Sequence, residues 1–580
     1  MANRNAEVLD FLRELAQLTV LAEQNPQSFR SRSYDRARHA LEGVTEDLSE
    51  LSESALQKID GIGKSTAKKI REYFDKGSVE KLEKLRERFP PSVIELSRIP
   101  GIGPKTLNRM RQDLGIEDLD GLKRAIDADQ LQTIEGLGAK SQQKIAQAID
   151  RLGLKHGEKR TPLYRAMRVA DQLVAELLER RDVIDAVPCG SLRRHRETVG
   201  DLDIVVASHD AGPIMDWFAE HPLAKDVVAK GETKTSIVTR YGLQVDLRVV
   251  TKDQLGAAVM YFTGSKDHNI RLRQRAMQKG WTLNEYALTD ATSGEVIASK
   301  DETSIYQALD LPYIEPPMRE DTGEIEAAAQ GALPEPLQAE DLLGDLHVHT
   351  DRSGDGRSSL LEMVTEASNR GYTYLAITDH AENLPLIGVS REELERQADE
   401  MEALAEQFPN VRLLRGFELN IDRDGGLDYD EEFRAGLDWC IAAVHSHYDL
   451  PQAKQTDRII QAISDPSVRV IGHLTGRMIG ARPGIDIDID AVLDALVDTG
   501  VALEINCALP RMDAAAPVLR RAGAKGVTFV VSTDSHHFRE MGKRAPYGAR
   551  QAQRGWVDKQ QIANTWSQDR FLGWLSKQRA

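Results

Sequence analysis

The stretch of residues 190–206 reads GSLRRHRETVGDLDIVV, and it decides the fold of the middle of this chain. Its apolar, β-branched end is typical of a buried strand. Side chains two residues apart on a strand share one face, so Asp201 and Asp203 can hold the same metal ions. Most Asp-x-Asp pairs at strand ends are solvated turns. Here a Gly-Ser turn stands ten residues before Asp201, and this combination is much less common than either part.

The same region supplies the other groups that nucleotidyl transfer needs. Asp246, in the strand-like run QVDLRV, offers a third carboxylate, and two magnesium ions roughly 3.5–4 Å apart would bracket an in-line phosphoryl displacement. Gly190 and Ser191 begin a turn whose hydroxyl and backbone amides, together with Arg194, can bind a triphosphate. In such a site the protein contributes positioning and charge neutralisation.

A second motif narrows the class of nucleotidyltransferase. Tyr261-Phe-Thr-Gly-Ser265 is followed by Asn269 and Arg273. With this motif, residues 1–312 resemble family X DNA polymerases, the group that includes polymerase beta. The resemblance implies an α+β nucleotidyltransferase palm in which Tyr261, Phe262 and Gly264 shape the sugar pocket. It also implies that Asn269 reaches the minor-groove edge of the incoming nucleotide and that Arg273 approaches the template. The alternative is that the two aromatic residues are core residues.

A short glycine pattern occurs three times before this palm. The copies are Ile59-Asp-Gly61-Ile-Gly63, Ile99-Pro-Gly101-Ile-Gly103 and Ile134-Glu-Gly136-Leu-Gly138, each followed by a basic, helix-forming segment. They resemble the helix-hairpin-helix motif, in which a tight turn approaches a phosphate and the next helix offers its N-terminal amides. A lone G-x-G would be only a turn. The first copy matches neither nucleotide-binding pattern, because Lys58 stands where a P-loop needs glycine and Thr66 stands where the dinucleotide fingerprint needs its last glycine.

The first hairpin region also resembles the small lyase domain of polymerase beta, which forms a Schiff base with the sugar at an abasic site. Lys69 falls at the position of the reactive lysine and Tyr34 at a supporting position. Ser65 departs from the pattern, which has a second lysine there. The alternative is that Lys69, in a basic helix, contacts phosphate.

Histidines dominate the motifs of the C-terminal part. Eight of the 14 histidines lie in residues 343–580, and most follow apolar runs. Strands of a closed barrel that point their C-terminal ends at one pocket would produce this pattern. The motifs in chain order are DLHVHT from Asp345, TDH from Thr378, GFE from Gly416, VHSH from Val444, IGH from Ile471 and STDSH from Ser532.

This half resembles the PHP family, named for polymerase and histidinol phosphatase, whose fold is a seven-stranded variant of the β/α barrel. The ligand positions of the family fall on His347, His349, Asp355, His380, Glu418, His445, His473, Asp534 and His536. Imidazoles with carboxylates suit zinc or manganese, and nine ligands suffice for three ions when carboxylates bridge. Such a cluster activates water for hydrolysis of phosphate esters. His447 and His537 receive no ligand role.

The resemblance also bears on substrate and reaction. The PHP family includes a phosphatase of histidinol phosphate, but fusion to a polymerase favours a DNA 3′ end. In bacterial family X enzymes of this architecture the resemblance implies manganese-dependent 3′–5′ exonuclease activity, with cleavage at abasic sites and removal of blocked 3′ ends as further activities.

Composition agrees with a multidomain protein that acts on DNA. At 580 residues the chain should hold several domains. Of the net charge of -17, residues 1–312 carry only -1, so local basic faces there can still meet phosphates. No apolar run could span a membrane, and the polar segment 1–7 lacks a secretory signal. Cys189, Cys440 and Cys507 form no pair, as expected of core thiols. We expect a cytoplasmic monomer.

The predicted architecture has a helical N-terminal region, a palm and a C-terminal barrel. The expected parts are 1–90 (lyase-like domain), 91–160 (DNA-binding hairpin region), 161–255 (palm), 256–312 (nucleotide-selection, thumb-like subdomain), 313–342 (linker rich in Pro, Glu and Ala) and 343–580 (PHP domain). Amphipathic helices are expected at Val8–Leu21, Leu56–Phe74 and Leu360–Arg370. Strands are expected at Tyr374–Thr378, Trp439–Val444 and Phe529–Ser532.

Together these features predict a repair polymerase that fills gaps in gapped or nicked DNA from deoxynucleoside triphosphates and hydrolyses 3′ ends in its C-terminal domain. Magnesium or manganese would serve the palm. One alternative is that the barrel is only a structural platform, although its intact ligand set argues against this. Another pairs a non-templated nucleotidyltransferase with a small-molecule phosphatase, which the three hairpins disfavour.

Overall fold

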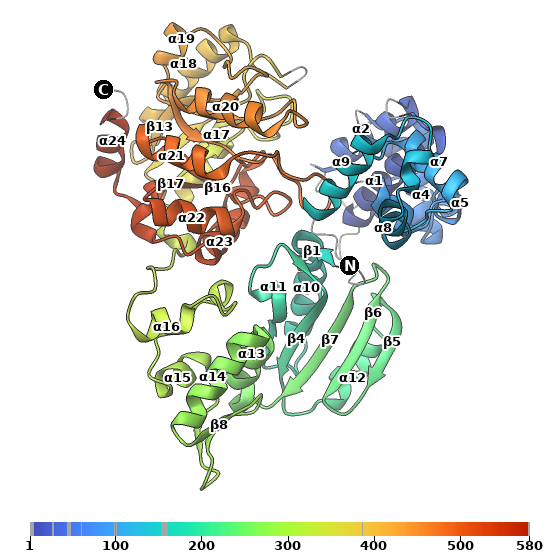
Figure 1. Ribbon diagram of the computed structural model, residues 1–580, viewed down its shortest axis with the longest axis vertical. Coiled ribbons are helices and arrows are strands. Elements are labelled where there is room, and N and C mark those ends of the chain that lie inside the picture. Colours follow the sequence, from blue (N-terminus) through green and yellow to red (C-terminus); the bar gives the residue numbers. More distant parts are fainter. Residues whose placement is uncertain are drawn as a thin grey trace. The chain divides into compact units, whose positions relative to one another are not determined.

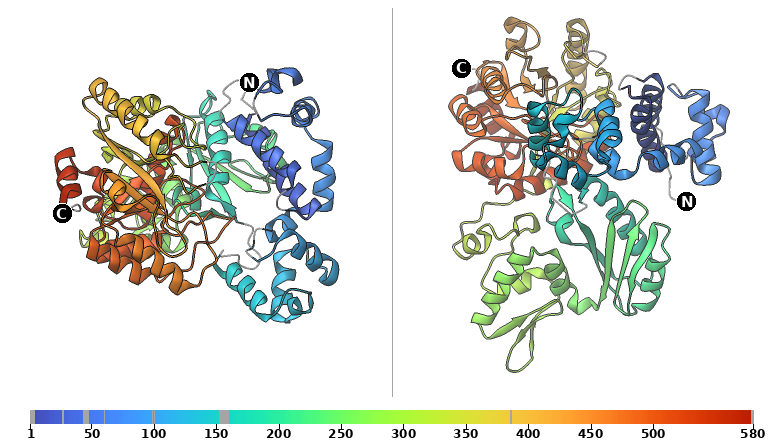
Figure 2. Two further views of the ribbon diagram at one scale, coloured as in Figure 1. Left: turned by 90° about the horizontal axis from the view of Figure 1, so that it is seen from above. Right: turned by 45° about the vertical axis from the view of Figure 1, so that its right-hand side comes forward.

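The computed structural model describes residues 5–25, 28–42, 48–59, 61–97, 99, 101–151, 160–384 and 387–577. Asp60 and Pro100, inside two of the predicted hairpins, lie outside these residues. The chain forms two compact units. The first contains the N-terminal helices, and the second contains the palm, the thumb-like subdomain and the C-terminal barrel (Figures 1 and 2).

The N-terminal unit is entirely helical in its described residues. Its elements are α1 (Asn5–Glu23), α2 (Phe29–Glu42), η1 (Leu48–Glu50), α3 (Glu53–Leu56), α4 (Lys64–Lys76), α5 (Glu80–Arg88), α6 (Pro91–Leu96), α7 (Pro104–Leu114), α8 (Leu119–Asp127), η2 (Gln130–Thr133) and α9 (Ala139–Arg151). One apolar core joins all these helices. The helix predicted over Leu56–Phe74 is wrong as a single element, because the first hairpin ends α3 and α4 starts only at Lys64.

The palm is built on a five-stranded sheet with strand order β2-β4-β7-β6-β5. Its elements are β1 (Thr161–Pro162), α10 (Leu163–Leu178), β2 (Asp185–Pro188), α11 (Gly190–Arg193), β3 (Thr198–Val199), β4 (Asp201–Ala207), α12 (Gly212–Ala219), β5 (Ala224–Lys230), β6 (Lys234–Thr239), β7 (Gln244–Val250) and η3 (Lys252–Gln254). Strands β4 and β7 are parallel neighbours. Strand β4 ends in a continuous apolar run, whereas β7 alternates apolar and polar residues, and the apolar side chains of both strands lie in the palm core.

The thumb-like subdomain follows directly. It contains α13 (Leu255–Thr263), α14 (Lys266–Gln278), the antiparallel strands β8 (Trp281–Leu283), β9 (Leu288–Asp290) and β10 (Val296–Ala298), and α15 (Glu302–Ala308). The segment expected as a linker has structure of its own, with η4 (Pro316–Met318), α16 (Glu324–Ala329) and η5 (Ala339–Asp341). Ile314, Met318 and Ile325 pack into the core of the thumb-like subdomain. Short apolar contacts of this kind leave no periodic pattern in the sequence.

The C-terminal half is a parallel barrel whose seven strands follow one another in chain order. The strands are β11 (Gly344–Val348), β12 (Tyr374–Ile377), β13 (Arg412–Asn420), β14 (Trp439–Ala443), β15 (Val468–Ile471), β16 (Ala502–Asn506) and β17 (Phe529–Ser532). A parallel bridge between Val348 and Ser535 brings the first and last strands together. The predicted fold class, with helical hairpins, palm and PHP barrel, is confirmed (Figure 1).

Helices surround the barrel and close one end of it. They are α17 (Leu360–Asn369), α18 (Arg391–Gln407), α19 (Glu431–Ala435), α20 (Gln452–Ile463), α21 (Ile489–Thr499), α22 (Ala516–Lys525), α23 (Phe538–Arg554), η6 (Lys559–Gln561), η7 (Ala563–Thr565) and α24 (Gln568–Lys577). Phe571 of α24 packs against the barrel residues Tyr374 and Trp439. The polar site is therefore confined to the carboxyl ends of the strands.

Two further expectations concern cysteines and membranes. Cys189, Cys440 and Cys507 are all free and buried, as predicted. Among the helices of the described residues, none combines the length and the apolar character that crossing a bilayer requires.

Candidate active sites

The three carboxylates of the palm lie on two neighbouring strands. Asp201 and Asp203 belong to β4, and Asp203 is the direct register partner of Asp246 on the parallel strand β7. Lys234 on β6 places its Nζ 2.6 Å from Asp246 Oδ2, and Gln244 donates to Asp246 Oδ1 over 3.0 Å. The structure thus brings together all three predicted carboxylates. Their assignment as metal ligands stays a prediction.

Among the three carboxylates, Asp203 has the raised pKa. Burial raises its pKa to about 7, with further contributions from the like charges of Asp201 and Asp246. Gly190 leaves the room that this carboxylate occupies, because a Cβ built there would lie 2.7 Å from Asp203 Oδ2. Gly190 also has a φ of +64°, which glycine adopts at little cost. Clustered carboxylates with a raised pKa are suited to a divalent cation, which replaces the proton.

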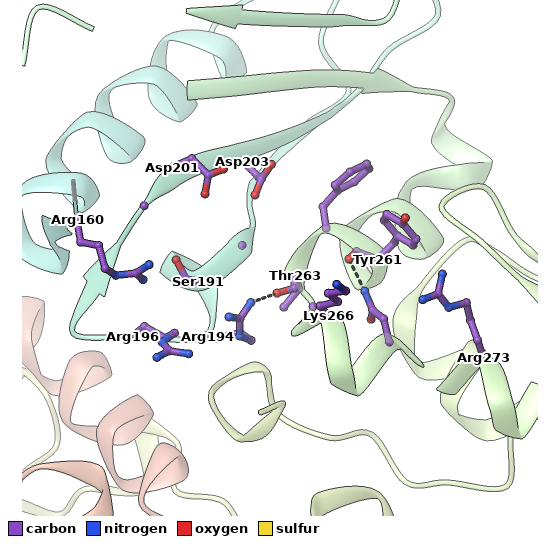
Figure 3. Close-up of a pocket in the computed structure, with 15 residues that line it drawn as sticks. Arg160, Ser191, Arg194, Arg196, Asp201, Asp203, Tyr261, Thr263, Lys266 and Arg273 are labelled. Carbon is purple, nitrogen blue, oxygen red and sulfur yellow. Dashed lines mark hydrogen bonds between the residues drawn. The ribbon is translucent and has the colours of Figure 1, made fainter. Parts of the chain in front are cut away.

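An open cleft of about 450 Å³ lies in front of these carboxylates (Figure 3). This volume falls in the range of small-molecule sites. Its lining contains two of the three predicted catalytic carboxylates, Asp201 and Asp203, and all eight predicted substrate residues: Gly190, Ser191, Arg194, Tyr261, Phe262, Gly264, Asn269 and Arg273. The lining also contains Arg160, Arg196 and Lys266, three cations that the sequence analysis missed. A concentration of cations beside carboxylates is what a triphosphate with its metals requires.

The aromatic pair in the cleft is held by its neighbours. Tyr261 and Phe262 are half-buried and meet edge to face with ring centroids 5.1 Å apart. The Arg248 guanidinium lies 4.4 Å from the centroid of Phe262. Asn269 donates from Nδ2 to the Tyr261 carbonyl oxygen over 2.7 Å (Figure 3). Because both rings line the cleft, they are available to a ligand as well as to the core.

The three hairpins share one backbone geometry. Gly61, Gly101 and Gly136 have φ values of 84°, 93° and 89°, a left-handed conformation that favours glycine. The helices α4 and α7 have Gly63 and Gly103 as N-caps, and no side chain caps either helix. Their first amides are therefore available to an external anion. In the third copy α9 starts after Gly138, but the preceding element is the 3-10 helix η2.

A second cleft, of about 600 Å³, lies beside the first hairpin. Gly61 and Gly63 line it together with Arg32, Arg36 and Lys58, so backbone amides and cations face the same space. The arginines on α2 were not singled out from the sequence, although the run FRSRSYDRAR shows their density.

Lys69 lies on α4 close to Tyr34. Its Nζ is 5.7 Å from the centroid of the Tyr34 ring, and Lys81 donates to the Tyr34 hydroxyl over 3.2 Å. Lys69 Nζ also donates to Ser65 Oγ over 2.8 Å. The serine that departs from the family pattern therefore holds the candidate lysine in place.

In the barrel, Glu418 at the end of β13 is the centre of the histidine cluster. Its Oε1 lies 2.7 Å from His473 Nε2 and 3.0 Å from His445 Nε2. Its Oε2 lies 2.9 Å from His380 Nδ1. The same oxygen is 3.4 Å from His347 Nε2 and 3.5 Å from His349 Nε2. One carboxylate surrounded by imidazoles has the arrangement of a bridging ligand.

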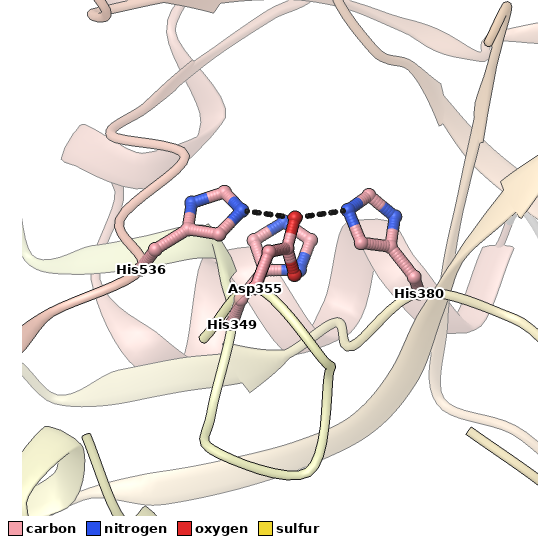
Figure 4. A group of neighbouring side chains, drawn as sticks. All are labelled: His349, Asp355, His380 and His536. Carbon is pink, nitrogen blue, oxygen red and sulfur yellow. Dashed lines mark hydrogen bonds and ion pairs between the residues drawn. The ribbon is translucent and has the colours of Figure 1, made fainter. Parts of the chain in front are cut away.

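The remaining predicted ligands complete overlapping groups. His349, Asp355, His380 and His536 form one group, in which Asp355 Oδ2 lies 3.1 Å from His536 Nε2 and 3.3 Å from His380 Nε2 (Figure 4). His347, His349 and Asp534 form a second group, and His380, Glu418 and His445 a third. His473 joins them through Glu418. The structure thus gathers all nine predicted residues, and their ligand roles stay a prediction.

The buried nitrogens of this cluster fit a metal. Six buried ring nitrogens make no hydrogen bond, namely both of His349, both of His445, His347 Nε2 and His380 Nδ1. Glu418 oxygens lie 2.9–3.5 Å from four of these atoms but without the geometry of a hydrogen bond. Buried polar atoms without partners are costly, and metal coordination removes that cost. Burial alone would raise the pKa of Glu418, but the surrounding imidazoles hold it well below its usual value. Glu418 is therefore an ionised carboxylate, as a ligand must be.

Several buried carboxylates around the cluster were not predicted. Glu504, in the apolar strand β16, lies 2.6 Å from His347 Nδ1 and leaves Nε2 of that ring for the site. Asp345 accepts from Thr533, and Asp379 accepts from Thr350 and Ser353. A charged residue inside an apolar strand, as in ALEIN, is the signal that identifies Glu504. His537 caps α23 through Nδ1, and His447 is exposed.

Comparisons with protein families agree with this division of the chain. Residues 3–79 match a helix-hairpin-helix domain, and residues 93–151 match a SAM-like helix-hairpin-helix tandem. Residues 258–320 match the DNA polymerase beta thumb, and residues 345–508 match the PHP domain. The fold and both sites therefore define a polymerase of the beta type joined to a PHP domain.

Individual relatives cover the whole chain or one of its halves. The DNA polymerase/3′-5′ exonuclease PolX of Bacillus subtilis is 36% identical over 561 residues, which is 96% of this chain and 97% of the relative. The DNA polymerase lambda of Rattus norvegicus is 27% identical over 50% of the chain and 52% of its own length. A probable phosphatase of Vibrio vulnificus is 30% identical over 34% of the chain and 80% of its own length. The chain belongs to the family X DNA polymerases with a C-terminal PHP domain.

Proposed function

We propose that the palm fills short gaps in DNA by templated, two-metal nucleotidyl transfer. The observation that carries this proposal is the register of β4 and β7, which sets Asp203 beside Asp246 at the cationic cleft. Magnesium or manganese would be held by Asp201, Asp203 and Asp246 and would neutralise the phosphates. Ser191 and Arg194 then bind the triphosphate, while Tyr261, Phe262 and Gly264 receive the sugar.

The remaining cleft residues select the nucleotide. Both Asn269 and Arg273 line the cleft. Asn269 would donate to the minor-groove edge of the nascent base pair, and Arg273 would contact the template. Gly61, Gly63, Gly101, Gly103, Gly136 and Gly138 belong to turns that bring backbone amides to phosphates, so DNA binding is independent of sequence. The substrate class is therefore gapped or nicked DNA with deoxynucleoside triphosphates.

Primer extension on a gapped duplex tests the palm. The Asp201→Ala variant should lose nucleotide incorporation, because the remaining carboxylates cannot hold both ions. Asp226→Ala, which removes an exposed carboxylate from β5 of the same sheet, is the matched control and should keep the wild-type rate. Incorporation at the wild-type rate by Asp201→Ala would overturn the assignment.

For the barrel we propose manganese- or zinc-dependent 3′–5′ exonuclease activity. Up to three ions would be held by the nine clustered residues and would supply an activated water and charge neutralisation. The buried imidazole nitrogens around Glu418 that make no hydrogen bond support this proposal. Cleavage at abasic sites and removal of blocked 3′ ends belong to the same reaction class, hydrolysis of phosphate esters.

Elemental analysis tests the barrel independently of activity. His349→Ala should reduce bound manganese or zinc, because His349 belongs to two of the three candidate groups. His447→Ala is the control, since this exposed histidine belongs to none of them. Unchanged metal content in a folded His349→Ala protein would rule out the assignment.

The N-terminal lysine offers a further activity. Lys69 beside Tyr34 can attack the aldehyde of an abasic sugar, which would give the lyase reaction. Borohydride should then trap the wild-type protein on abasic DNA but not Lys69→Ala, and equal trapping of both proteins would exclude Lys69. We place the enzyme in the cytoplasm as a monomer that acts in base-excision or break repair.

A further inference from the structure

The loop of residues 194–197 connects α11 to β3 and carries Arg194, the proposed triphosphate-binding arginine. It contacts the PHP domain as well as the thumb-like subdomain. Arg194 donates from Nη1 to the Thr263 carbonyl oxygen over 2.5 Å, at the edge of the nucleotide cleft. Its Nε lies 3.1 Å from Oε1 of Glu320. Glu320 comes from the segment after the thumb-like core, and no motif in the sequence drew attention to it. The acceptor beside Arg194 is therefore supplied from outside the palm.

Glu320 joins cations from two domains. Its Oε2 lies 3.2 Å from Arg196 Nη1, and its Oε1 lies 2.9 Å from Nη1 of Arg554, the last residue of α23 in the PHP domain. The side chains of Arg194, Glu320 and Arg554 are only 11–16% exposed. In such a setting charge-assisted hydrogen bonds are strong and geometrically exacting. Burial would raise the pKa of Glu320, but the arginines hold it below its usual value, so the carboxylate stays ionised.

Arg554 also donates hydrogen bonds to backbone carbonyl oxygens of the loop and of the segment after the thumb-like core. The same Nη1 atom donates to the Arg194 carbonyl oxygen over 3.0 Å and to the Pro317 carbonyl oxygen over 3.3 Å. One nitrogen of a PHP-domain side chain thus contacts the palm loop, the thumb segment and the bridging carboxylate. Beside it, the ring of His195 stacks on Tyr547 of α23 with centroids 6.3 Å apart and an angle of 20°.

Apolar packing supports the polar contacts. Met512 of the PHP domain is part of the buried core of the palm, and Ile479, Leu509 and Tyr547 pack against that core. Arg477 adds an ion pair of 2.8 Å with Glu197, the last residue of the loop. The PHP domain therefore has a packed contact from which it can fix the conformation of the loop.

We propose that Glu320 and Arg554 are positioning residues for the incoming nucleotide, through which the PHP domain holds Arg194 in the orientation that binds the triphosphate. This inference rests on the proposed role of Arg194 in the polymerase site. Glu320 fixes the guanidinium from its Nε side, and Arg554 fixes both Glu320 and the backbone of Arg194. Neither residue lines the cleft. Both therefore act through Arg194, and Glu320 also contacts Arg196 of the cleft lining.

Steady-state gap filling by the full-length protein tests whether Glu320 and Arg554 position Arg194. Glu320→Gln and Arg554→Ala should each raise the KM for the nucleotide about tenfold while kcat changes by no more than about twofold, because a bond to a positioning charge is lost. Glu320→Gln/Arg554→Ala should be no worse than the more impaired of its two single variants, because Arg554 and Glu320 hold the same arginine. Arg521→Ala, which removes an exposed PHP-domain ion pair with Asp490, should leave both constants unchanged.

A conservative variant separates positioning from general stability. The three bonds of Arg554 come from one nitrogen, so Arg554→Lys can replace them and should restore KM to within about threefold of wild type. An unchanged KM in Glu320→Gln and Arg554→Ala, or a lower KM, would overturn the proposal. So would failure of Arg554→Lys to improve on Arg554→Ala.

Arg194→Ala separates the proposed role of Arg194 from the proposed role of Glu320 and Arg554. If this variant keeps the wild-type KM, the proposed role of Arg194 itself is wrong. If Arg194→Ala raises KM but the Glu320 and Arg554 variants do not, the proposed polymerase site is supported, and only the positioning role of Glu320 and Arg554 is wrong. Elemental analysis and 3′ hydrolysis of each variant confirm that the barrel is folded, and both should remain at wild-type levels.

Discussion

At the scale of single residues, Gly190 shows how the sequence shapes the metal site. Only glycine combines a φ of +64° with the absence of a Cβ that would lie 2.7 Å from Asp203 Oδ2. Gly190→Ala should therefore displace Asp203 and reduce incorporation by roughly 100-fold, as misplacement of a reacting group by about 1 Å can do. Gap-filling rates at saturating nucleotide measure the effect.

Gly242 provides the control for this prediction. It has a φ of +79°, but no atom lies within 4 Å of the place that an added Cβ would take, so Gly242→Ala carries the same backbone cost without touching Asp203. Equal losses in the two variants would show that backbone strain, and not the carboxylate, explains the effect of Gly190→Ala.

The raised pKa of Asp203 predicts a pH dependence. Metal binding needs the carboxylate, which burial and the neighbouring Asp201 and Asp246 keep protonated below about pH 7. The apparent affinity of the palm for magnesium should therefore fall about tenfold per pH unit below 7 and level off above it. Magnesium titrations of incorporation between pH 6 and 8.5 measure this. A flat profile would contradict the electrostatic account.

Some site residues could be predicted from the sequence and others could not. Asp201, Asp203 and Asp246 follow from strand periodicity, whereas the nine PHP positions follow from the resemblance to the PHP family. Arg160, Arg196 and Lys266 could not be found, because a basic residue in a loop carries no signal until the cleft is known. Glu504 was open to prediction, since a carboxylate inside an apolar strand needs a partner.

At the scale of elements, the hairpins offer a test that leaves the fold intact. Gly103 has an ordinary φ of -77°, and no atom lies within 4 Å of an added Cβ, so Gly103→Leu should fold normally. The new side chain would cover the first amides of α7 and weaken binding to all DNA sequences several-fold. Fluorescence anisotropy on two unrelated duplexes measures this.

Gly573→Leu is the matched control, since Gly573 on α24 also has open space around it. It should bind DNA as the wild type does. Loss of affinity for only one of the two duplexes in Gly103→Leu would mean that the hairpin reads sequence and not backbone.

The elements themselves were predictable where apolar runs are long. Strands β12, β14 and β17 and helix α17 lie within a residue of their expected ends. The break between α3 and α4 was missed as a boundary because apolar residues continue through the hairpin, where Ile62 is buried against the helices. Tertiary packing of the turn, and not helix periodicity, explains the pattern there.

At the scale of the whole molecule, the chain combines a polymerase site and a hydrolytic site that use different residues on different strands. Most of the negative charge lies in the half with the hydrolytic site: the net charge is -1 over residues 1–312 and -16 over residues 313–580. Composition suggested a linker at 313–342, but Ile314, Met318 and Ile325 are buried in the thumb-like core. A short segment rich in Pro and Glu can thus be ordered by a few apolar anchors, which composition alone does not reveal.

If synthesis and 3′ hydrolysis occur at separate metal sites, each site can be inactivated without loss of the other activity. A gapped duplex with a 5′-labelled primer is incubated with manganese, with and without nucleotides, and primer lengthening and shortening are followed for wild type, Asp201→Ala and His349→Ala. Asp201→Ala should only shorten the primer, and His349→Ala should only lengthen it. Loss of both activities in folded Asp201→Ala, or shortening at the wild-type rate by His349→Ala, would contradict separate metal sites.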